Sequence, residues 1–224
     1  MTNLEMLSSV ARGLGALKDN VVFVGGATIE LYLADQAGLK VRPTDDVDCV
    51  VEVVSRVEYH KMEERLRALC FSHPVGGKAP ICRWQYKEIQ VDIMPTEGKI
   101  LGFSNRWYPE GFERSIVTKL PDGQAIRIFA PPYLVASKVE AFKDRGKGDC
   151  LGSTDLEDIV TLLDGAPDFF GQILRAPEAV REYLQENFRE FIHDERFLDS
   201  LEGHLPPDGR RERVARMQAL LKKF

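Results

Sequence analysis

The chain has 224 residues and a formal net charge of −5 at pH 7. Hydrophobic residues make up 44% and charged residues 29%, which is typical of a globular protein. No apolar run approaches the ~20 residues that a membrane-spanning helix needs, and the N-terminal residues lack the pattern of a secretory signal. We therefore predict a cytoplasmic protein without membrane contact, and the net charge argues against a general nucleic-acid binder.

Cysteines and histidines are few and scattered. No two cysteines have the spacing of zinc ligands, and no histidine cluster lies beside them. Nothing in the sequence brings a histidine next to a nucleophile. We therefore expect reduced thiols without a catalytic role and disfavour a hydrolase that uses a Ser-His or Cys-His pair. The cysteines are Cys49, Cys70, Cys82 and Cys150.

Apolar periodicity predicts a mixed α/β region followed by a helical one. An amphipathic helix opens the chain at about residues 7–17, and another follows at about 59–69. From Pro131 onward the pattern is helical, with a break at 206–209 before a last helix. We expect an α/β (α+β) fold with a mixed twisted sheet over residues 1–130 and a mainly helical domain over 131–224. Strands are expected near 21–24, 47–54, 81–86 and 88–94, and in a hairpin of 114–120 and 124–129.

The first expected strand ends in a glycine pair, Gly25 and Gly26, before a helical segment of about ten residues. Without Cβ atoms, backbone N–H groups at such a turn approach a phosphate closely, and the dipole of a following helix favours the same anion. Thr28 supplies a hydroxyl just after the pair. Because most glycine pairs are merely turns, this feature gains weight only in its context.

Three aspartates supply that context. Strand alternation places Asp46 and Asp48 on one face, and Asp92 lies on the more polar face of a later, otherwise apolar strand. Carboxylates so close repel each other unless a cation lies between them, and Mg²⁺ prefers oxygen ligands. A site with two such ions is typical of phosphoryl transfer by in-line displacement. The three aspartates therefore predict a divalent-metal site.

The order of these features resembles the DNA polymerase beta-type nucleotidyltransferase superfamily. Its pattern is Gly-Gly-Ser or Gly-Gly-Thr, a spacer, two acids separated by one apolar residue, and a third acid on a neighbouring strand. This chain departs from it at Ala27, so that the hydroxyl comes one residue later, at Thr28. The matching positions are Gly25, Gly26, Asp46, Asp48 and Asp92.

Three segments resemble one group within that superfamily, the AbiEii and MenT types of bacterial toxin nucleotidyltransferases. They are residues 42–48, 136–145 and 154–160, within a resemblance that covers roughly residues 20–165. It implies that Lys138 offsets charge on a triphosphate and that Asp158 approaches the site. Without the resemblance, a lone lysine is more often on a solvated helix face paired with acids. Thr154 and Glu157 have the spacing of a capping box, which predicts a helix start there.

The resemblance implies a transfer of a nucleoside monophosphate from an NTP to an acceptor hydroxyl, with release of pyrophosphate. Two Mg²⁺ ions, or Mn²⁺, would be held by Asp46, Asp48 and Asp92, and Asp92 would help to deprotonate the acceptor. The glycine pair would hold the β and γ phosphates. Residues 1–130 would form the catalytic core and 131–224 would complete the cleft. The group also implies tRNA as acceptor and a partner antitoxin.

Other interpretations stay open. A small-molecule nucleotidyltransferase of the aminoglycoside-modifying kind would share the site, and a non-catalytic member would bind nucleotide or a partner without chemistry. Residues 209–224 hold six basic residues against one acidic, which would suit tRNA or another polyanion. A terminal amphipathic helix with solvated bases is the favoured alternative for that segment. Arg83 and Lys87, beside the strand of Asp92, are candidates to contact the base or acceptor.

Overall fold

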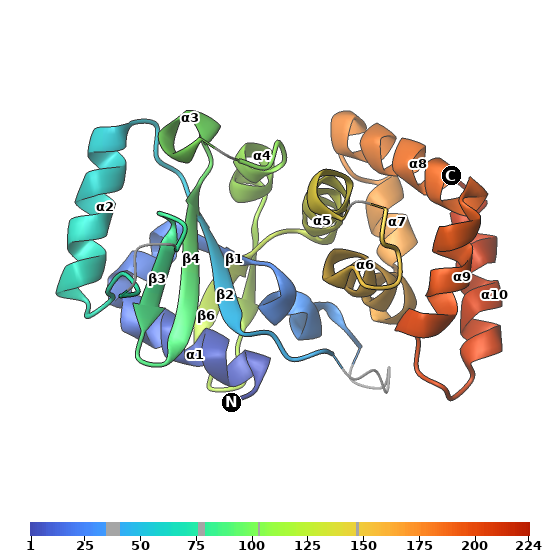
Figure 1. Ribbon diagram of the computed structural model, residues 1–224, viewed down its shortest axis with the longest axis horizontal. Helices are drawn as coiled ribbons and strands as arrows, with labels where there is room; N and C mark the ends of the chain where they lie inside the picture. Colours follow the sequence, from blue (N-terminus) through green and yellow to red (C-terminus); the bar gives the residue numbers. More distant parts are fainter. Residues whose placement is uncertain (35–40, 76–78, 103, 147) are drawn as a thin grey trace. The chain divides into compact units, whose positions relative to one another are not determined.

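The computed structural model describes residues 1–34, 41–75, 79–102, 104–146 and 148–224. The chain forms two compact units (Figure 1). The first comprises Met1–Leu31 and Arg42–Ala130, and the second comprises Tyr32–Val41 and Pro131–Phe224. The expected division into residues 1–130 and 131–224 stays a prediction.

The described residues of the first unit form a mixed sheet in the order β3-β4-β2-β1-β6-β5. Strand β2 runs antiparallel to β1 and parallel to β4, while β3 and β4 form one antiparallel hairpin and β5 and β6 another. The expected strands are all found, but β2 ends at Val51 instead of residue 54. The strands are β1 (Val21–Val24), β2 (Asp46–Val51), β3 (Arg83–Tyr86), β4 (Ile89–Pro95), β5 (Ile116–Lys119) and β6 (Ala125–Ile128).

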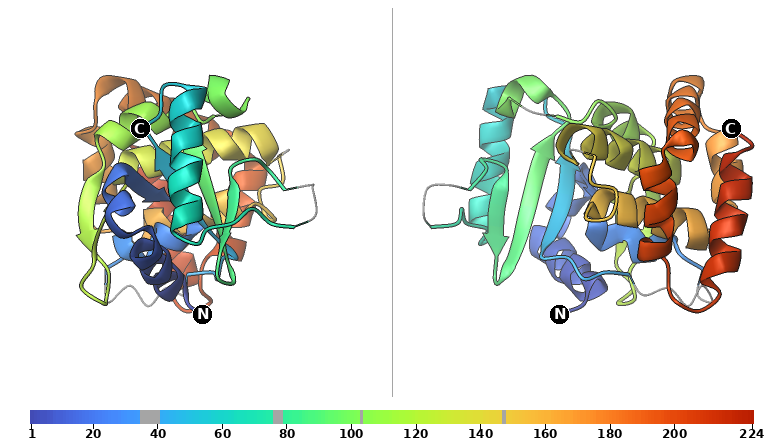
Figure 2. Two further views of the ribbon diagram at one scale, coloured as in Figure 1. Left: turned by 90° about the vertical axis from the view of Figure 1, so that its left-hand side faces the viewer. Right: turned by 45° about the vertical axis from the view of Figure 1, so that its right-hand side comes forward.

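Helices cover this sheet. Helix α1 (Asn3–Leu14) begins with a capping box between Thr2 and Glu5 and packs against β2 and β4. Helix α2 (Arg56–Ala68) runs alongside β3 and β4 (Figure 2), where its Tyr59 hydroxyl donates to the Ile93 carbonyl at 3.2 Å. Two shorter helices, α3 (Gly98–Leu101) and α4 (Tyr108–Glu113), follow β4, and the 3-10 helix η1 (Gly15–Asn20) precedes β1.

The segment after the glycine pair is a 3-10 helix, η2 (Gly26–Tyr32), of seven residues, not the expected helix of about ten. Two hydrogen bonds close its tight first turn. The Gly25 carbonyl accepts both, one from the backbone N–H and one from the hydroxyl of Thr28. A helix so short and tightly wound contributes little macrodipole. The argument for a phosphate at this position therefore rests on the turn alone.

The second unit is helical (Figure 2). Helix α5 is its centre, because it contacts α6, α7 and α8 and buries every side chain from Pro131 to Val139. Helix α6 is capped by Ser153, not by Thr154 as expected, since the Ser153 hydroxyl accepts from the Leu156 backbone N–H. The helices are α5 (Pro131–Arg145), α6 (Thr154–Gly165), α7 (Phe169–Leu174), α8 (Glu178–His193), α9 (Glu195–His204) and α10 (Arg210–Leu221).

All four cysteines carry free thiols, as expected. Three are buried and Cys70 is exposed. Burial raises the pKa of the Cys82 thiol to about 11, which leaves it protonated and unreactive near neutral pH. In the part of the chain that the structure describes, no helix combines the length and the apolar character needed to cross a membrane.

Candidate active site

Neighbouring strands bring a row of functional residues to one level of the sheet. Asp92 on β4 lies opposite Asp48 on the parallel strand β2 and opposite Arg83 on the antiparallel strand β3. Asp48 in turn lies opposite Val24, the last residue of β1 before the glycine pair. Directly opposed residues point to the same face of a sheet. The topology thus aligns an arginine, two aspartates and the glycine turn.

Asp46 completes an acidic cluster with Asp48 and Asp92. Ligand oxygens from the three carboxylates all lie within 4.8 Å of one another. Asp92 is 9% exposed, and the other two are half-buried. Oxygen donors at this spacing suit Mg²⁺ or Mn²⁺. The structure brings the three predicted aspartates together, and their binding of metal stays a prediction. No second group of three metal-ligating side chains comes together in the described ranges.

The segment before β2 is anchored by a residue that the sequence pattern did not single out, Asn3. Its side chain is buried, donates to the Arg42 carbonyl at 3.0 Å and accepts from the Thr44 backbone N–H at 3.1 Å. The Thr44 hydroxyl then donates to the Asp46 carboxylate at 2.9 Å. These contacts connect the start of helix α1 to the first acid of the site.

Arg83 supplies a cation inside the acidic cluster. Its Nε donates to Asp92 Oδ1 at 2.8 Å and its Nη2 to Asp92 Oδ2 at 2.7 Å, while Nη2 lies 3.7 Å from Asp46 Oδ2. The hydrogen bonds to Asp92 raise the pKa of the Arg83 guanidinium. Sequence reasoning offered Arg83 only as a contact for base or acceptor and missed this ion pair.

A signal for that ion pair is present in the sequence of the β3–β4 hairpin. Tyr86 pairs with Ile89, so that only Lys87 and the residue after it form the turn. Lys87 adopts a positive φ of 55°, as tight turns require. Counting back from a two-residue turn places Arg83 directly opposite Asp92, but the turn length had to be known first.

The glycine turn touches the acidic cluster. Gly25 has a φ of +77°, and a Cβ added there would lie 2.0 Å from Asp48 Oδ2. Glycine is therefore required both by the backbone conformation and by the approach of the carboxylate. Thr28, expected as a phosphate ligand, is fully buried, and its hydroxyl donates to the Gly25 carbonyl at 2.9 Å. Thr28 thus supports the turn, and contacts of Thr28 and Gly26 with phosphate stay predictions.

Lys138 and Asp158 meet in the second unit, between helices α5 and α6. Lys138 Nζ lies 2.6 Å from Asp158 Oδ2 and 3.7 Å from Asp155 Oδ1, and all three side chains are less than 10% exposed. Arg145 donates to both oxygens of Asp155, at 3.0 and 3.1 Å. Lys138 is therefore paired with acids in a buried network, whereas the Arg145 side chain, on the same helix, keeps 70% of its surface exposed. The roles of Lys138 and Asp158 toward a nucleotide stay predictions.

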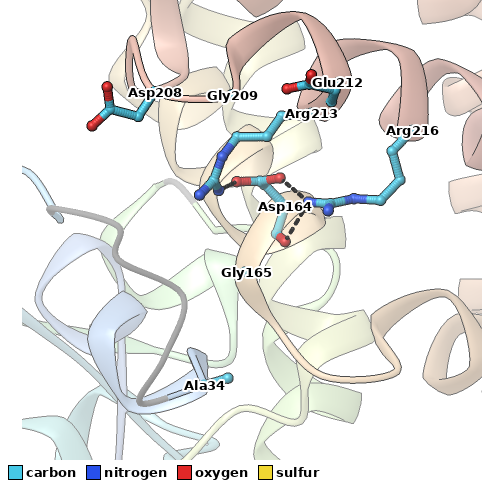
Figure 3. A pocket seen from close by; sticks show the side chains of 8 residues that line it. All are labelled: Ala34, Asp164, Gly165, Asp208, Gly209, Glu212, Arg213 and Arg216. Atoms are coloured by element: carbon cyan, nitrogen blue, oxygen red, sulfur yellow. Dashed lines mark hydrogen bonds and ion pairs between the residues drawn. The ribbon is translucent and has the colours of Figure 1, made fainter.

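Part of the basic C-terminal segment also has a structural role. Figure 3 shows Arg213 and Arg216 of α10 converging on Asp164 at the end of α6, and the Asp164 side chain has no exposed surface. They border a cavity of about 500 Å³ that Asp208 and Glu212 also line. Two apolar positions of α10, Met217 and Leu221, are buried, as the amphipathic-helix alternative expected.

The family of the chain follows from a comparison with known proteins. The model of the family described as nucleotidyl transferase AbiEii toxin, Type IV TA system, matches residues 10–223. The chain belongs to the AbiEii family. The resemblance seen over residues 20–165 is thereby confirmed, and the chain is a nucleotidyltransferase of a toxin–antitoxin family.

The fold of this AbiEii protein also has a counterpart among solved structures. The chain is similar to an antigenic nucleotidyltransferase-like protein from Paracoccidioides brasiliensis, with a TM-score of 0.56 and 18% sequence identity. The match covers 84% of this chain and 88% of the other. At this identity the likeness concerns the fold, and it confirms the expected α/β nucleotidyltransferase architecture. No curated protein sequence matches the chain significantly.

Proposed function

We propose that this AbiEii enzyme moves a nucleoside monophosphate from an NTP to an acceptor hydroxyl, with Mg²⁺ or Mn²⁺ held by Asp46, Asp48 and Asp92. The observation that carries the proposal is the contact between the acidic cluster and the glycine turn, since Asp48 Oδ2 occupies the space beside Gly25. A carboxylate cluster and a phosphate-binding turn at one place are what a metal–triphosphate complex needs. Two bound cations would lower the pKa of the attacking hydroxyl and neutralise charge on the leaving group.

The chain's own residues have distinct parts in the reaction. Backbone N–H groups at Gly25 and Gly26 hold the β and γ phosphates. Asp92 accepts the proton of the acceptor hydroxyl, whose oxygen forms a bond to the α-phosphorus. The bond between the α-phosphorus and the bridging oxygen breaks at the same time, and pyrophosphate leaves with those electrons. Asp46 and Asp48 would hold the cations, and through them would orient the triphosphate for in-line attack.

Lys138 has a separate role in the proposal, which rests on the family resemblance. Its ammonium offsets the charge of the triphosphate, as a preorganised cation does in phosphoryl transfer. Asp158 acts through Lys138, because the 2.6 Å ion pair fixes the position of the Nζ atom. Thr28 acts through Gly25 in the same sense, by holding the turn that faces the phosphates.

We further propose tRNA as the acceptor and an antitoxin protein as the partner, in the cytoplasm. The toxin–antitoxin family supports the partner, and the resemblance to AbiEii and MenT toxins supports tRNA. Arg211, Lys222 and Lys223 are exposed at the C-terminal end, where they offer a basic surface to a polyanion. Nothing in the described residues favours a small-molecule acceptor over this one.

A label-transfer assay tests the proposal. The purified protein is incubated with Mg²⁺ and each α-labelled NTP in turn, together with total tRNA, total protein or no acceptor. The Asp46→Ala/Asp48→Ala double variant is the control for contaminating enzymes. We expect label on tRNA only with the intact acids. Label on protein alone would overturn the tRNA proposal, and no transfer with any NTP or acceptor would count against the catalytic one.

A further inference from the structure

Arg83 occupies the position of a cation within the acidic cluster. Its guanidinium engages both oxygens of Asp92 in a bidentate pair, at 2.8 and 2.7 Å, and its Nη2 also faces Asp46 at 3.7 Å. Two of the three carboxylates that define the candidate metal centre are therefore already neighbours of one positive charge. Bidentate arginine–carboxylate pairs are among the strongest charged hydrogen bonds in proteins.

The surroundings of Arg83 allow its side chain to move. Strand β3 is at the end of the sheet order, and the Arg83 side chain keeps 28% of its surface exposed, against 12% for that of Asp92. The guanidinium thus reaches solvent without unpacking the core. Its neighbour Trp84, which points to the other face, is fully buried and anchors the strand.

A divalent cation and the guanidinium compete for the same oxygens. A carboxylate that accepts two hydrogen bonds from one guanidinium has its most favourable lone-pair directions occupied, and a second cation beside it would repel the first. The three carboxylates need a counter-charge in the metal-free protein, because they lie within 4.8 Å of one another. Arg83 supplies this counter-charge in the metal-free protein. When a divalent cation binds, the carboxylates no longer need the charge of Arg83.

We propose that Arg83 is an exchangeable counter-ion: it neutralises the acidic cluster in the metal-free protein, gives up Asp92 when a divalent cation binds, and then binds the phosphates of the incoming triphosphate. This inference rests on the proposed function for the metal site. The planar fork that binds the Asp92 carboxylate is equally suited to phosphate oxygens. Metal binding would therefore prepare the site for the nucleotide.

Mn²⁺ binding to the full-length protein, measured by calorimetry and by the loss of the free Mn²⁺ resonance signal, tests the exchange. Arg83→Gln removes the competing charge, so we expect Mn²⁺ to bind more tightly by about tenfold, a usual size for coupling between ligands. Arg83→Lys keeps the charge but loses the fork, and its affinity should fall between the two. Arg67→Gln is the matched control, since it removes the same charge from helix α2 beside the buried Trp84, and it should change the affinity by less than about twofold.

A second titration tests the contact with phosphate. Inorganic triphosphate serves as the probe because it needs no choice of base, and it is titrated at a Mn²⁺ concentration that saturates the metal site of every variant. We expect Arg83→Gln to weaken its binding by about tenfold and Arg83→Lys to restore part of the loss. Circular dichroism spectra of all variants establish that they are folded before either titration.

The outcomes separate this inference from the function on which it rests. Loss of Mn²⁺ binding in the Asp46→Ala/Asp48→Ala variant would support the metal site. If Arg83→Gln then binds Mn²⁺ with an affinity equal to or weaker than that of wild type, the exchange is overturned and the metal site is kept. Unchanged triphosphate affinity in Arg83→Gln would overturn the contact with phosphate. No Mn²⁺ binding to any variant would overturn the metal site and the exchange together.

Discussion

The Asp48 carboxylate fills the space beside Gly25. Any side chain at this position would have to displace that carboxylate, since its Cβ would lie 2.0 Å from Oδ2. The residue also needs a positive φ, which costs a non-glycine residue about 1–2 kcal/mol. These two costs can be separated, because another glycine in the same unit has the second cost without the first.

Gly25→Ala should therefore reduce nucleotidyl transfer by about 10²-fold, the scale expected when a reacting group moves by about 1 Å. Gly123→Ala is the control. Gly123 has a φ of +84° in the β5–β6 turn, and no described atom lies within 4 Å of an added Cβ. Gly25→Ala should lose at least as much stability as Gly123→Ala in urea unfolding, and only Gly25→Ala should lose activity. Equal activities would mean that the contact with Asp48 does not matter for the reaction.

Asp48 itself should be dispensable for folding. Asp48→Asn keeps the shape of the side chain and removes one of three mutually repelling charges, so the free energy of unfolding without metal should stay within about 1 kcal/mol of wild type. Label transfer should fall by at least about 10²-fold, as on the loss of a preorganised charged group. Retained transfer by a folded Asp48→Asn protein would contradict the assignment of the acidic cluster.

Local pattern explains which residues of the site could be predicted. Asp46 and Asp48 are two apart in one strand, so that alternation alone places them on one face. The partner of Arg83 depends on the register across a hairpin, and the burial of Lys138 depends on how α5 packs. A local sequence pattern determines neither the register between two strands nor how deeply a helix is buried in its unit.

At the scale of elements, the α5–α6 pair is held by a buried ion pair. Lys138 and Asp158 are 6% and 2% exposed, which makes the loss of either partner costly because the other would keep an uncompensated charge. This position implies a structural role, and the family resemblance implies a role in transfer. A double substitution distinguishes them.

Lys138→Met alone should lower the free energy of unfolding by about 3–5 kcal/mol, and Lys138→Met/Asp158→Leu should recover part of that loss, because apolar pairs of similar size often replace buried ion pairs without penalty. Urea unfolding measures both. We expect the double variant to fold and yet to remain inactive in label transfer, because it lacks the ammonium that we propose offsets the charge of the triphosphate. Recovery of transfer together with stability would assign Lys138 a structural role alone.

Element types were predictable where side-chain periodicity decides them. The strands and the long helices have clear patterns of burial, and they were found near their expected bounds. The 3-10 helix η2 could not be predicted from periodicity, because its winding is set by the two hydrogen bonds that Thr28 donates to the Gly25 carbonyl. The start of α6 was displaced by one residue for a similar reason, since Ser153 competes successfully with Thr154 for the cap.

At the scale of the whole molecule, an acidic protein carries a basic C-terminal segment. Not all of these bases are available to a partner. Arg213 and Arg216 bind the buried Asp164, and Arg210 donates to the Leu205 carbonyl at 3.0 and 3.2 Å. A test of polyanion binding should therefore spare them, because their loss would disturb the packing of α10 on α6.

The triple variant Arg211→Gln/Lys222→Gln/Lys223→Gln meets that requirement. We expect unchanged thermal stability and weaker tRNA binding, with a salt dependence that is lower by about one unit of slope for each base that contacts a phosphate. Filter binding at several salt concentrations measures the slope. Asp164→Asn should show the reverse, a loss of stability with tRNA binding retained in the folded fraction. Equal slopes for wild type and the triple variant would exclude this segment as the tRNA surface.

The two-residue turn between β3 and β4 has a consequence for how this protein tolerates change. Loops normally accept insertions, but here the length of the turn sets which residue of β3 lies opposite Asp92 in the candidate site. One added residue would move β3 out of phase, turning Arg83 toward the core and the apolar Trp84 toward the acids. Such an insertion would substitute no functional residue, yet it would remove the guanidinium from the acidic cluster and leave the site more negative.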